Sequence, residues 1–189
     1  MAKIIISENV TLDGVVEDPT GEEGFRQGGW FLQVASNDRD GFYQAALDEA
    51  LGAEALLMGR RTYEFFVARW PSRTGELADR MNTMPKYVVS STLGETDWGG
   101  TTVITGDAVK EASYLKQQLT GEIVVPGSRQ LVRTLIEHKL VDELRLMVYP
   151  FVLGAGERLF GENSDKTSLR LNNNQTLGDS LIYLTYEVV

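Results

Sequence analysis

Hydrophobic positions follow two patterns that alternate along the chain. Short apolar runs are typical of buried strands, and apolar residues spaced three or four apart are typical of helices with one packed face. The first pattern predicts strands at 4–8, 55–58, 86–91, 101–105, 122–125 and 143–149. The second predicts helices at 40–51, 61–69, 77–81, 109–119 and 131–136. The long stretch 17–29, rich in Gly and Glu, is predicted to be a loop.

The pattern changes after Pro150, where Gly154, Gly156 and Gly161 mark a loop. Segments 168–172 and 180–188 follow, and the second alternates apolar and polar residues as an antiparallel strand does. Together these elements predict one α/β domain over residues 1–189. It should have three layers and a mostly parallel central sheet with antiparallel C-terminal strands.

Composition agrees with one folded domain and sets limits on its surroundings. The chain has 189 residues, of which 42% are hydrophobic, and no apolar run reaches the roughly 18 residues of a membrane-spanning helix. Residues 1–7 are too short for a signal peptide and read as a first strand. We therefore expect a cytoplasmic protein with no membrane partner.

The net charge of −9 argues against nucleic-acid binding, which requires a basic surface. The chain has no cysteine, which excludes disulfides, thiol catalysis and zinc–thiolate sites. Its single histidine, His138, excludes a two-histidine metal site. We expect no bound metal.

A glycine and two arginines stand where a strand passes into a helix, in the sequence Gly59-Arg60-Arg61-Thr62. Free N–H groups at a helix start attract anions, and arginine offers a planar fork that matches phosphate. Cations at this position oppose the helix dipole unless an anion binds. The turn therefore predicts a phosphate site, and the alternative is that the two arginines are only solvated charges.

A second turn repeats this arrangement. The apolar run 123–125 ends at Pro126-Gly127-Ser128, and a helix with Leu131 on its apolar face follows. Ser90 and Ser91 also stand at a strand end. Because the carboxyl ends of parallel strands share one edge of a sheet, these turns would clasp a long phosphorylated ligand. The chain has neither a G-x-G-x-x-G fingerprint after its first strand nor a Walker A motif.

An ordered set of motifs resembles a known family. The set comprises Thr11–Gly14, Leu57–Glu64, Val89–Ser91, Pro126–Ser128 with Leu131, and Tyr149–Pro150 followed by Leu153-Gly154 and Leu159-Phe160. It resembles the dihydrofolate-reductase-like family typified by the reductase domain of the bacterial riboflavin-biosynthesis deaminase–reductase. The resemblance implies an NADPH-dependent reductase similar to 5-amino-6-(5-phosphoribosylamino)uracil reductase, often a homodimer. We expect no zinc deaminase half in this chain, because that half needs His and Cys ligands and the chain has no Cys and one His.

The resemblance also implies roles for individual residues. Arg60 would hold the 2′-phosphate of NADPH, while Gly59 and Thr62, assisted by Arg61, would meet its phosphates. Ser90 and Ser91 would flank the adenosine half, and Gly127, Ser128 and Leu131 would hold the pyrophosphate and the nicotinamide side. Thr11, Asp13 and Gly14 would lie near the nicotinamide or the entrance to the substrate pocket. Leu153 and Gly154 would lie in the substrate pocket.

A nicotinamide supplies a hydride, so the protein must also manage one proton. The candidate donors are Asp13 and Asp40, each with an ordinary alternative: Asp13-Gly14 is a common turn pair, and Asp38 or Asp40 would cap a helix. Trp30, Phe31 and Phe160 would form the wall of the substrate pocket, unless they belong to the core. Alternative functions are a dihydrofolate (pterin) reductase, a non-catalytic NADPH-binding module and a dimeric scaffold with a vestigial site.

Overall fold

The structure is a computed structural model that describes residues 1–161 and 166–189. Its strands are β1 (Lys3–Thr11), β2 (Ala53–Gly59), β3 (Lys86–Val89), β4 (Thr101–Ile104), β5 (Glu122–Pro126), β6 (Glu143–Tyr149), β7 (Leu169–Leu177) and β8 (Leu181–Val188). Its helices are α1 (Ser36–Gly52), α2 (Arg60–Val67), α3 (Glu76–Thr83), α4 (Ala108–Gln118) and α5 (Arg129–Glu137), with a 3₁₀ turn, η1, at Trp30–Leu32.

The described strands form one eight-stranded sheet in the order β4-β3-β2-β5-β1-β6-β8-β7. The first six strands of this order, β4-β3-β2-β5-β1-β6, run parallel to one another. Strand β8 is antiparallel to both β6 and β7. The predicted α/β fold with a mostly parallel sheet and antiparallel C-terminal strands is confirmed. Parallel strands buried on both faces account for continuous apolar runs such as that of Ile4, Ile5 and Ile6, all fully buried.

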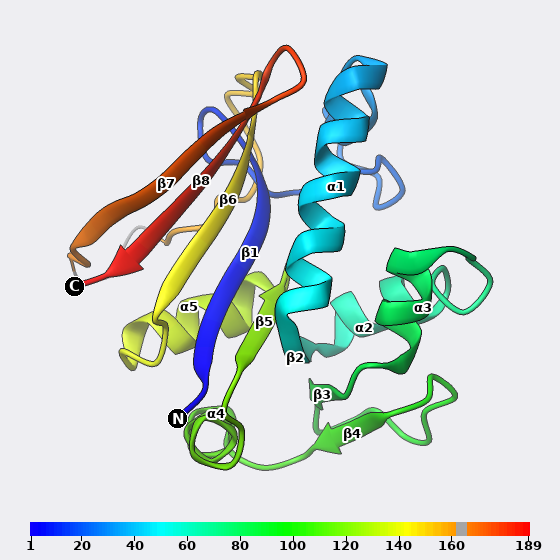
Figure 1. Cartoon of the computed structure of the whole chain (residues 1–189), viewed down its shortest axis with the longest axis vertical. Coiled ribbons are helices and arrows are strands. Elements are labelled where there is room, and N and C mark those ends of the chain that lie inside the picture. The colour runs from blue at the N-terminus through cyan, green and yellow to red at the C-terminus, as the bar shows by residue number, and fades with distance from the viewer. Residues whose placement is uncertain (162–165) are drawn as a thin grey trace.

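Helices cover both faces of this sheet (Figure 1). Helices α4 and α5 pack on one face around Ile6, Val125 and Leu135. Helices α1 and α3 pack on the other face around Leu56, Met58 and related residues. A third cluster joins Trp30, Tyr149 and Leu181 near the end of β6. The sheet is therefore the middle layer of three, as the sequence predicts.

The first strand is longer than its apolar run. Prediction ended it at Glu8, but the structure continues β1 to Thr11 because Asn9–Thr11 pair with Met147–Tyr149 of β6. Pairing with β5, in contrast, ends at Ser7, opposite Pro126. From Glu8 onward the β5 side of β1 has no strand partner among the described residues. This leaves an opening at the carboxyl edge of the sheet.

Helix α1 begins at Ser36, so the prediction of a start at Asp40 is wrong. Asp38 is buried and supports the helix start by accepting a hydrogen bond from the Ala35 amide, at 3.3 Å. It also accepts from Ser180 Oγ at 2.6 Å and from the amides of Asp179 and Ser180. The prediction that Asp38 or Asp40 is the cap is wrong, because the N-cap is Ala35; Asp38 is the third residue of the helix and bonds back to the Ala35 amide, and Asp40 is exposed on the helix.

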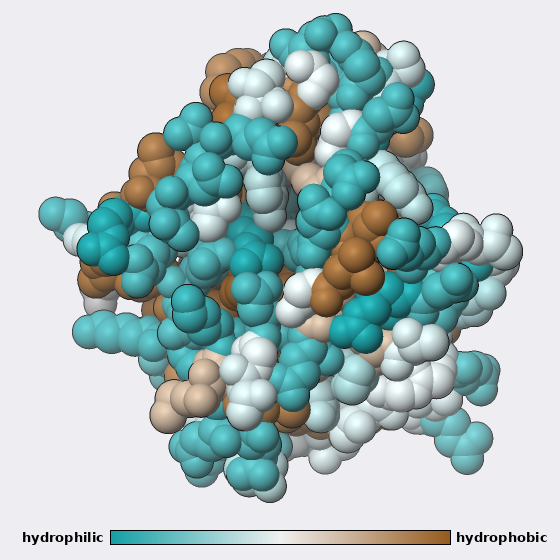
Figure 2. All heavy atoms as spheres, viewed as in Figure 1, coloured by the Kyte–Doolittle hydropathy of each residue, from teal (hydrophilic) through white to brown (hydrophobic). Residues whose placement is uncertain are grey.

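Polar residues cover most of the face seen in Figure 2, with small hydrophobic areas between them. Among the described residues, no helix is both long and apolar enough to cross a membrane.

Candidate active site

A cavity of about 1070 Å³ lies at the carboxyl edge of the sheet. Its wall draws on β1, the turns after β2 and β5, the helices α1, α2 and α5, and the loop 16–23. The sequence-predicted residues that line it are Phe31, Gly59, Arg60, Arg61, Thr62, Gly127, Ser128 and Leu131. Two turns that were recognised separately in the sequence therefore share one cavity.

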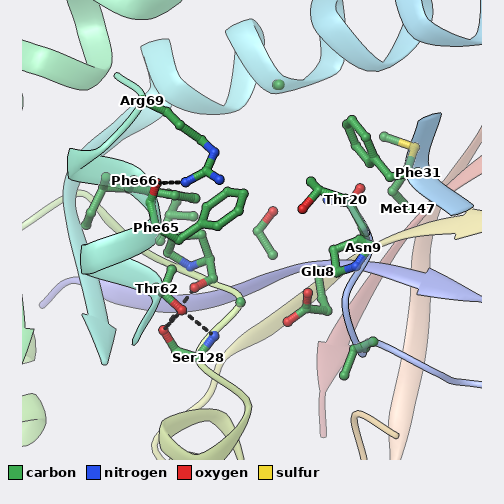
Figure 3. Close-up of a pocket in the computed structure, with 18 of the residues that line it drawn as sticks. Glu8, Asn9, Thr20, Phe31, Thr62, Phe65, Phe66, Arg69, Ser128 and Met147 are labelled. Atoms are coloured by element: carbon green, nitrogen blue, oxygen red, sulfur yellow. Dashed lines mark hydrogen bonds between the residues drawn. The ribbon is translucent and has the colours of Figure 1, made fainter. Parts of the chain in front are cut away.

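Hydrogen bonds clasp these two turns together (Figure 3). Thr62 Oγ1 accepts from the Ser128 amide at 3.0 Å and lies 3.0 Å from Ser128 Oγ. The Gly59 amide donates to Ser128 Oγ, also at 3.0 Å. These contacts fix the start of α2 against the start of α5 across 66 residues of sequence.

The backbone at the second turn favours an exposed helix start. Gly127 has φ 53° and Ser128 has φ 58°, a left-handed conformation that is uncommon for a residue with a side chain. A Cβ on Gly127 would lie 3.2 Å from Thr62 Oγ1, which explains why glycine fits there. Ser128 makes no side-chain cap to α5, so the first N–H groups of this helix remain available to an anion.

The arginines of α2 are held in different ways. Arg60 Nε lies 2.6 Å from Glu64 Oε1, and its Nη1 donates to Thr92 Oγ1 at 2.6 Å. Arg61 is largely exposed, and its Nη2 lies 3.1 Å from Glu23 Oε2. Arg60 thus reaches towards the loop after β3, whereas Arg61 faces the acidic loop that precedes α1.

Arg69 is a cavity residue that the sequence argument missed. Its guanidinium pairs with Glu22, stacks 3.6 Å from the centre of the Phe65 ring and donates to the Phe65 carbonyl (Figure 3). The sequence did contain a signal for Arg69, which lies about two helical turns beyond Arg61 and therefore on the same side of the predicted helix. A charged residue at a helix end is usually only solvated, so this spacing did not indicate a site.

Ser90 and Ser91 do not reach the cavity wall. Ser90 is buried, and its Oγ accepts the amides of Thr92 and Leu93 at 3.2 and 2.9 Å. It therefore shapes the turn after β3. The neighbouring Thr92, which the sequence argument missed, makes the contact with Arg60.

Thr11, Asp13, Gly14, Leu153 and Gly154 lie outside the cavity wall and join two loops instead. Asp13 accepts from Thr11 Oγ1 at 2.7 Å, from the Leu153 amide at 3.2 Å and from the Gly154 amide at 2.8 Å. Burial alone would raise the pKa of this carboxyl, but these hydrogen bonds outweigh it and hold the pKa below its usual value. Asp13 is therefore an ionised structural acceptor at neutral pH.

The remaining predicted site residues are also dispersed. Asp40 is exposed and Phe160 is 48% exposed, both away from the cavity. Trp30 is buried, donates its indole N–H to the Glu17 carbonyl and packs edge-on against Tyr149, so it belongs to the core. Phe31 does line the cavity, between Phe42 and Tyr149.

Glu8 is the most important residue that the sequence argument missed. Successive side chains of a strand alternate between faces, so Glu8 shares the α5 face with Ile4 and Ile6. It lines the cavity beside the opening where β1 leaves β5, with its carboxyl pointing towards the turn of Ser128 (Figure 3). Burial raises the pKa of this carboxyl to about 8, although the Asn9 amide and the charge of Arg129 act in the opposite direction.

Arg129, the first residue of α5, acts on Glu8 through its charge. Its Nη1 lies 2.7 Å from Glu157 Oε2, and its Nε is buried without a hydrogen-bond partner among the described residues. An unpartnered buried donor at a helix start is a favourable position for an anionic ligand. The described residues contain no group of His, Cys, Asp and Glu side chains suited to a metal ion.

Comparisons with known proteins agree with this architecture. The uncharacterized protein YyaP of Bacillus subtilis (strain 168) is 28% identical over 189 residues, which cover 97% of this chain and 94% of the relative. A putative riboflavin biosynthesis protein from Shewanella sp. PV-4 superposes with a TM-score of 0.75 at 24% identity, over 100% of this chain and 99% of that one. Dihydrofolate reductase from Enterococcus faecalis, solved with NADP(H), gives a TM-score of 0.59 at 16% identity, over 98% and 96% of the two chains.

At these identities the two solved structures establish the fold, which is dihydrofolate-reductase-like. The family is established by the sequence itself, because the model of the RibD C-terminal domain matches residues 2–183. The chain belongs to the RibD C-terminal domain family.

Proposed function

We propose that this protein is an NADPH-dependent reductase that transfers a hydride to a small heterocyclic or sugar-derived substrate. The observation that carries the proposal is the clasp between Thr62 and Ser128, which joins two anion-attracting turns at one edge of a parallel sheet. Membership of the RibD C-terminal domain family supports a reductase of the riboflavin-pathway type. The NADP(H) bound to the Enterococcus faecalis enzyme is consistent with the choice of cofactor.

The residues present fit a dinucleotide with an additional phosphate. The uncapped start of α5 and the unpartnered Nε of Arg129 would hold the pyrophosphate. Arg60, beside Thr92, would hold the 2′-phosphate that distinguishes NADPH from NADH. Binding there would require Arg60 to exchange part of its contact with Glu64, an exposed ion pair of small energy.

The cofactor supplies the hydride, and the protein must supply a proton. We assign this proton to Glu8 in preference to Asp13 and Asp40, because its raised pKa keeps the carboxyl protonated at neutral pH. Glu8 also lies at the opening through which the α5 side of the cavity meets the α1 side. The carboxyl of Glu8 is therefore adjacent both to the two turns that would bind the cofactor and to the part of the cavity between α1 and the sheet.

Direct titration tests the cofactor. NADPH is expected to quench tryptophan fluorescence and to raise the melting temperature. Arg60→Ala should weaken NADPH binding by about tenfold to a hundredfold, in line with the loss of a charge-assisted contact, and leave NADH binding almost unchanged. Arg170→Ala, an exposed arginine of β7 paired with Glu187, is the matched control. Equal losses for both cofactors would remove the 2′-phosphate assignment from Arg60.

A substrate screen separates the alternative functions. NADPH oxidation would be followed at its absorbance band with pterins, flavin precursors and small carbonyl compounds. Turnover of a pterin would identify a dihydrofolate-type reductase. Tight NADPH binding without oxidation by any compound would identify a cofactor-binding module, and absence of NADPH binding would indicate a vestigial site.

A further inference from the structure

One face of the C-terminal part of the sheet carries no charge. It is the α5-side face of β6, β8 and β7, which we call the hairpin face. Residues paired across neighbouring strands share a face, so the register defines its members. These are Leu144, Leu146, Val148, Leu169, Leu171, Asn174, Thr176, Ile182, Leu184, Tyr186 and Val188. The charged residues of the three strands all lie on the opposite face: Glu143, Arg145, Arg170 and Glu187.

The helices cover only one end of the hairpin face. There Leu144 lies in the cluster around Leu135 of α5, and Tyr186 and Val188 pack against that cluster. The rest of its apolar residues, apart from Leu146, belong to none of the three clusters of the described chain: Val148, Leu169, Leu171, Ile182 and Leu184. The side chain of Leu171 is 49% exposed and that of Ile182 is 43% exposed. Exposed apolar side chains gathered on one face mark an interaction surface.

The outer strand of this face lacks the usual protection of a sheet edge. Strand β7 is the last strand of the described sheet, and β8 is its one strand partner there (Figure 1). It has nine residues, whereas β4 at the other edge has four. Natural edge strands are commonly short or carry lysine or proline, and β7 contains neither residue. Its single charge, Arg170, is paired with Glu187. The edge is therefore open to another protein surface.

The charge distribution indicates that the partner is a second copy of this chain. Each copy has a net charge of −9, so two copies can approach closely only through surfaces that add no like charges to the contact. The hairpin face meets this condition, and a partner recognised by charge would find nothing on it to read. About a two-fold axis the face meets itself. Its polar members are compatible with this, because the Asn174 amide and the Thr176 hydroxyl can each donate and accept a hydrogen bond.

We infer that the hairpin face packs on the same face of a second copy about a two-fold axis. Leu171, Ile182 and Leu184 form the apolar core of the contact, and Asn174 and Thr176 form its rim. Three strands of this length make a face about 14 Å wide and about 26 Å long. That is enough for the core of an interface that takes roughly 800 Å² from each partner, with a rim supplied by the surroundings. The family resemblance implies a homodimer but no surface for it, and the contact is independent of the proposed reductase activity.

Sedimentation of the intact chain tests whether the dimer exists. Between about 1 μM and about 100 μM, which includes the weak end of the affinity range for standard interfaces, the protein should sediment as a closed dimer. The dimer should become tighter as salt is added, because salt screens the repulsion between two copies of charge −9 and the contact contains no ion pair. A monomer throughout this range, an open-ended series of larger species, or a dimer that salt dissociates would overturn the inference.

Lysine substitutions test the surface. Ile182→Lys and, separately, Leu171→Lys bring one charge from each copy into the contact, so each should weaken the dimer by at least about a hundredfold. Both positions are exposed in the single chain, so the variants should keep the circular dichroism of the folded protein, and either one decides if the other does not fold. Tyr114→Lys, at a 56% exposed position of α4, is the matched control. A folded variant that stays dimeric, or equal weakening by Tyr114→Lys, would overturn the assignment of the hairpin face.

Discussion

The two ends of the cavity have opposite electrostatic character. The end formed by α2 and α5 presents Arg60, Arg61, Arg69 and Arg129 around an uncapped helix start. The end between α1 and the sheet buries Glu49, and its Arg145 forms ion pairs with Glu49, Glu122 and Glu143. In a chain of net charge −9, four arginines gather at the α2 and α5 end, where each pairs with one carboxylate, whereas Arg145 pairs with three. The local placement of charge, and not the overall charge, therefore predicts which end takes which ligand.

Removing the acid at the junction should have the largest effect. Glu8→Gln should lower kcat by about a hundredfold or more, as expected for loss of a general acid, while NADPH binding remains. In the wild type, kcat/KM should fall as the pH rises above about 8, because ionised Glu8 has no proton to give. Stopped-flow and steady-state rates measure both effects, with the exposed Glu137→Gln of α5 as control. A wild-type pH profile retained in Glu8→Gln would exclude this role.

The same residue links stability to pH. Its folded pKa of about 8 exceeds the ordinary 4.5, so the folded protein holds more protons than the unfolded chain between these values. The stability of the wild type should therefore fall, relative to Glu8→Gln, as the pH rises from about 5 to about 8. Urea melts across this range measure the difference, and a constant difference would show that Glu8 is not shielded from water.

Breaking the hydrogen bonds between Thr62 and Ser128 should have the next largest effect. Thr62→Val keeps the shape of the side chain but leaves the Ser128 amide without its acceptor. Leaving this partly buried donor unsatisfied should lower the unfolding free energy by about 1 kcal/mol, and NADPH affinity should fall because the start of α5 is no longer fixed. Thr83→Val, on the exposed side of α3, is the control for the substitution itself. Unchanged NADPH binding in a destabilised variant would separate the clasp from the cofactor site.

Substitutions at Asp13 and Asp40 compare an acid that accepts hydrogen bonds within the fold with an acid that faces solvent. Asp13→Asn should lower the unfolding free energy by about 1–2 kcal/mol, since the amides of Leu153 and Gly154 lose a charged acceptor. The pKa of Asp13 is lowered, so its stabilisation is present at neutral pH and is lost as the pH falls through the folded pKa. Asp40→Asn, at an exposed position, should change stability by less than about 0.5 kcal/mol. A loss of kcat in Asp13→Asn comparable to that in Glu8→Gln would restore Asp13 as the proton donor.

The smallest expected effect concerns the acidic loop. Glu23→Gln removes the exposed partner of Arg61, so NADPH should bind up to about fivefold more tightly at low salt, consistent with 0.2–1 kcal/mol for such pairs. The gain should disappear at high ionic strength. Glu76→Gln on α3 is an exposed control. A gain that persists in 1 M salt would point to a change in loop structure instead.

Local pattern predicted most elements because apolar runs and helical spacing report burial directly. It failed at the ends of two strands, where pairing with another strand and not apolar pattern sets the length. The extension of β1 to Thr11 depends on pairing with β6, and β7 extends to Leu177 although its Asn-rich centre has no apolar alternation. The expected homodimer stays a prediction, which sedimentation analysis of the intact chain can test.

The sequence by itself determined the α/β fold, the family, and the two turns at Gly59–Thr62 and Gly127–Ser128, because each of these depends on short-range patterns. Tertiary structure decided that the turns are joined, that Asp13 is occupied by loop amides, and that Glu8 and Glu49 face the cavity. The physical reason is that the pKa and the free hydrogen-bonding capacity of a carboxyl depend on its surroundings. Those surroundings come from strands and helices that only folding brings together.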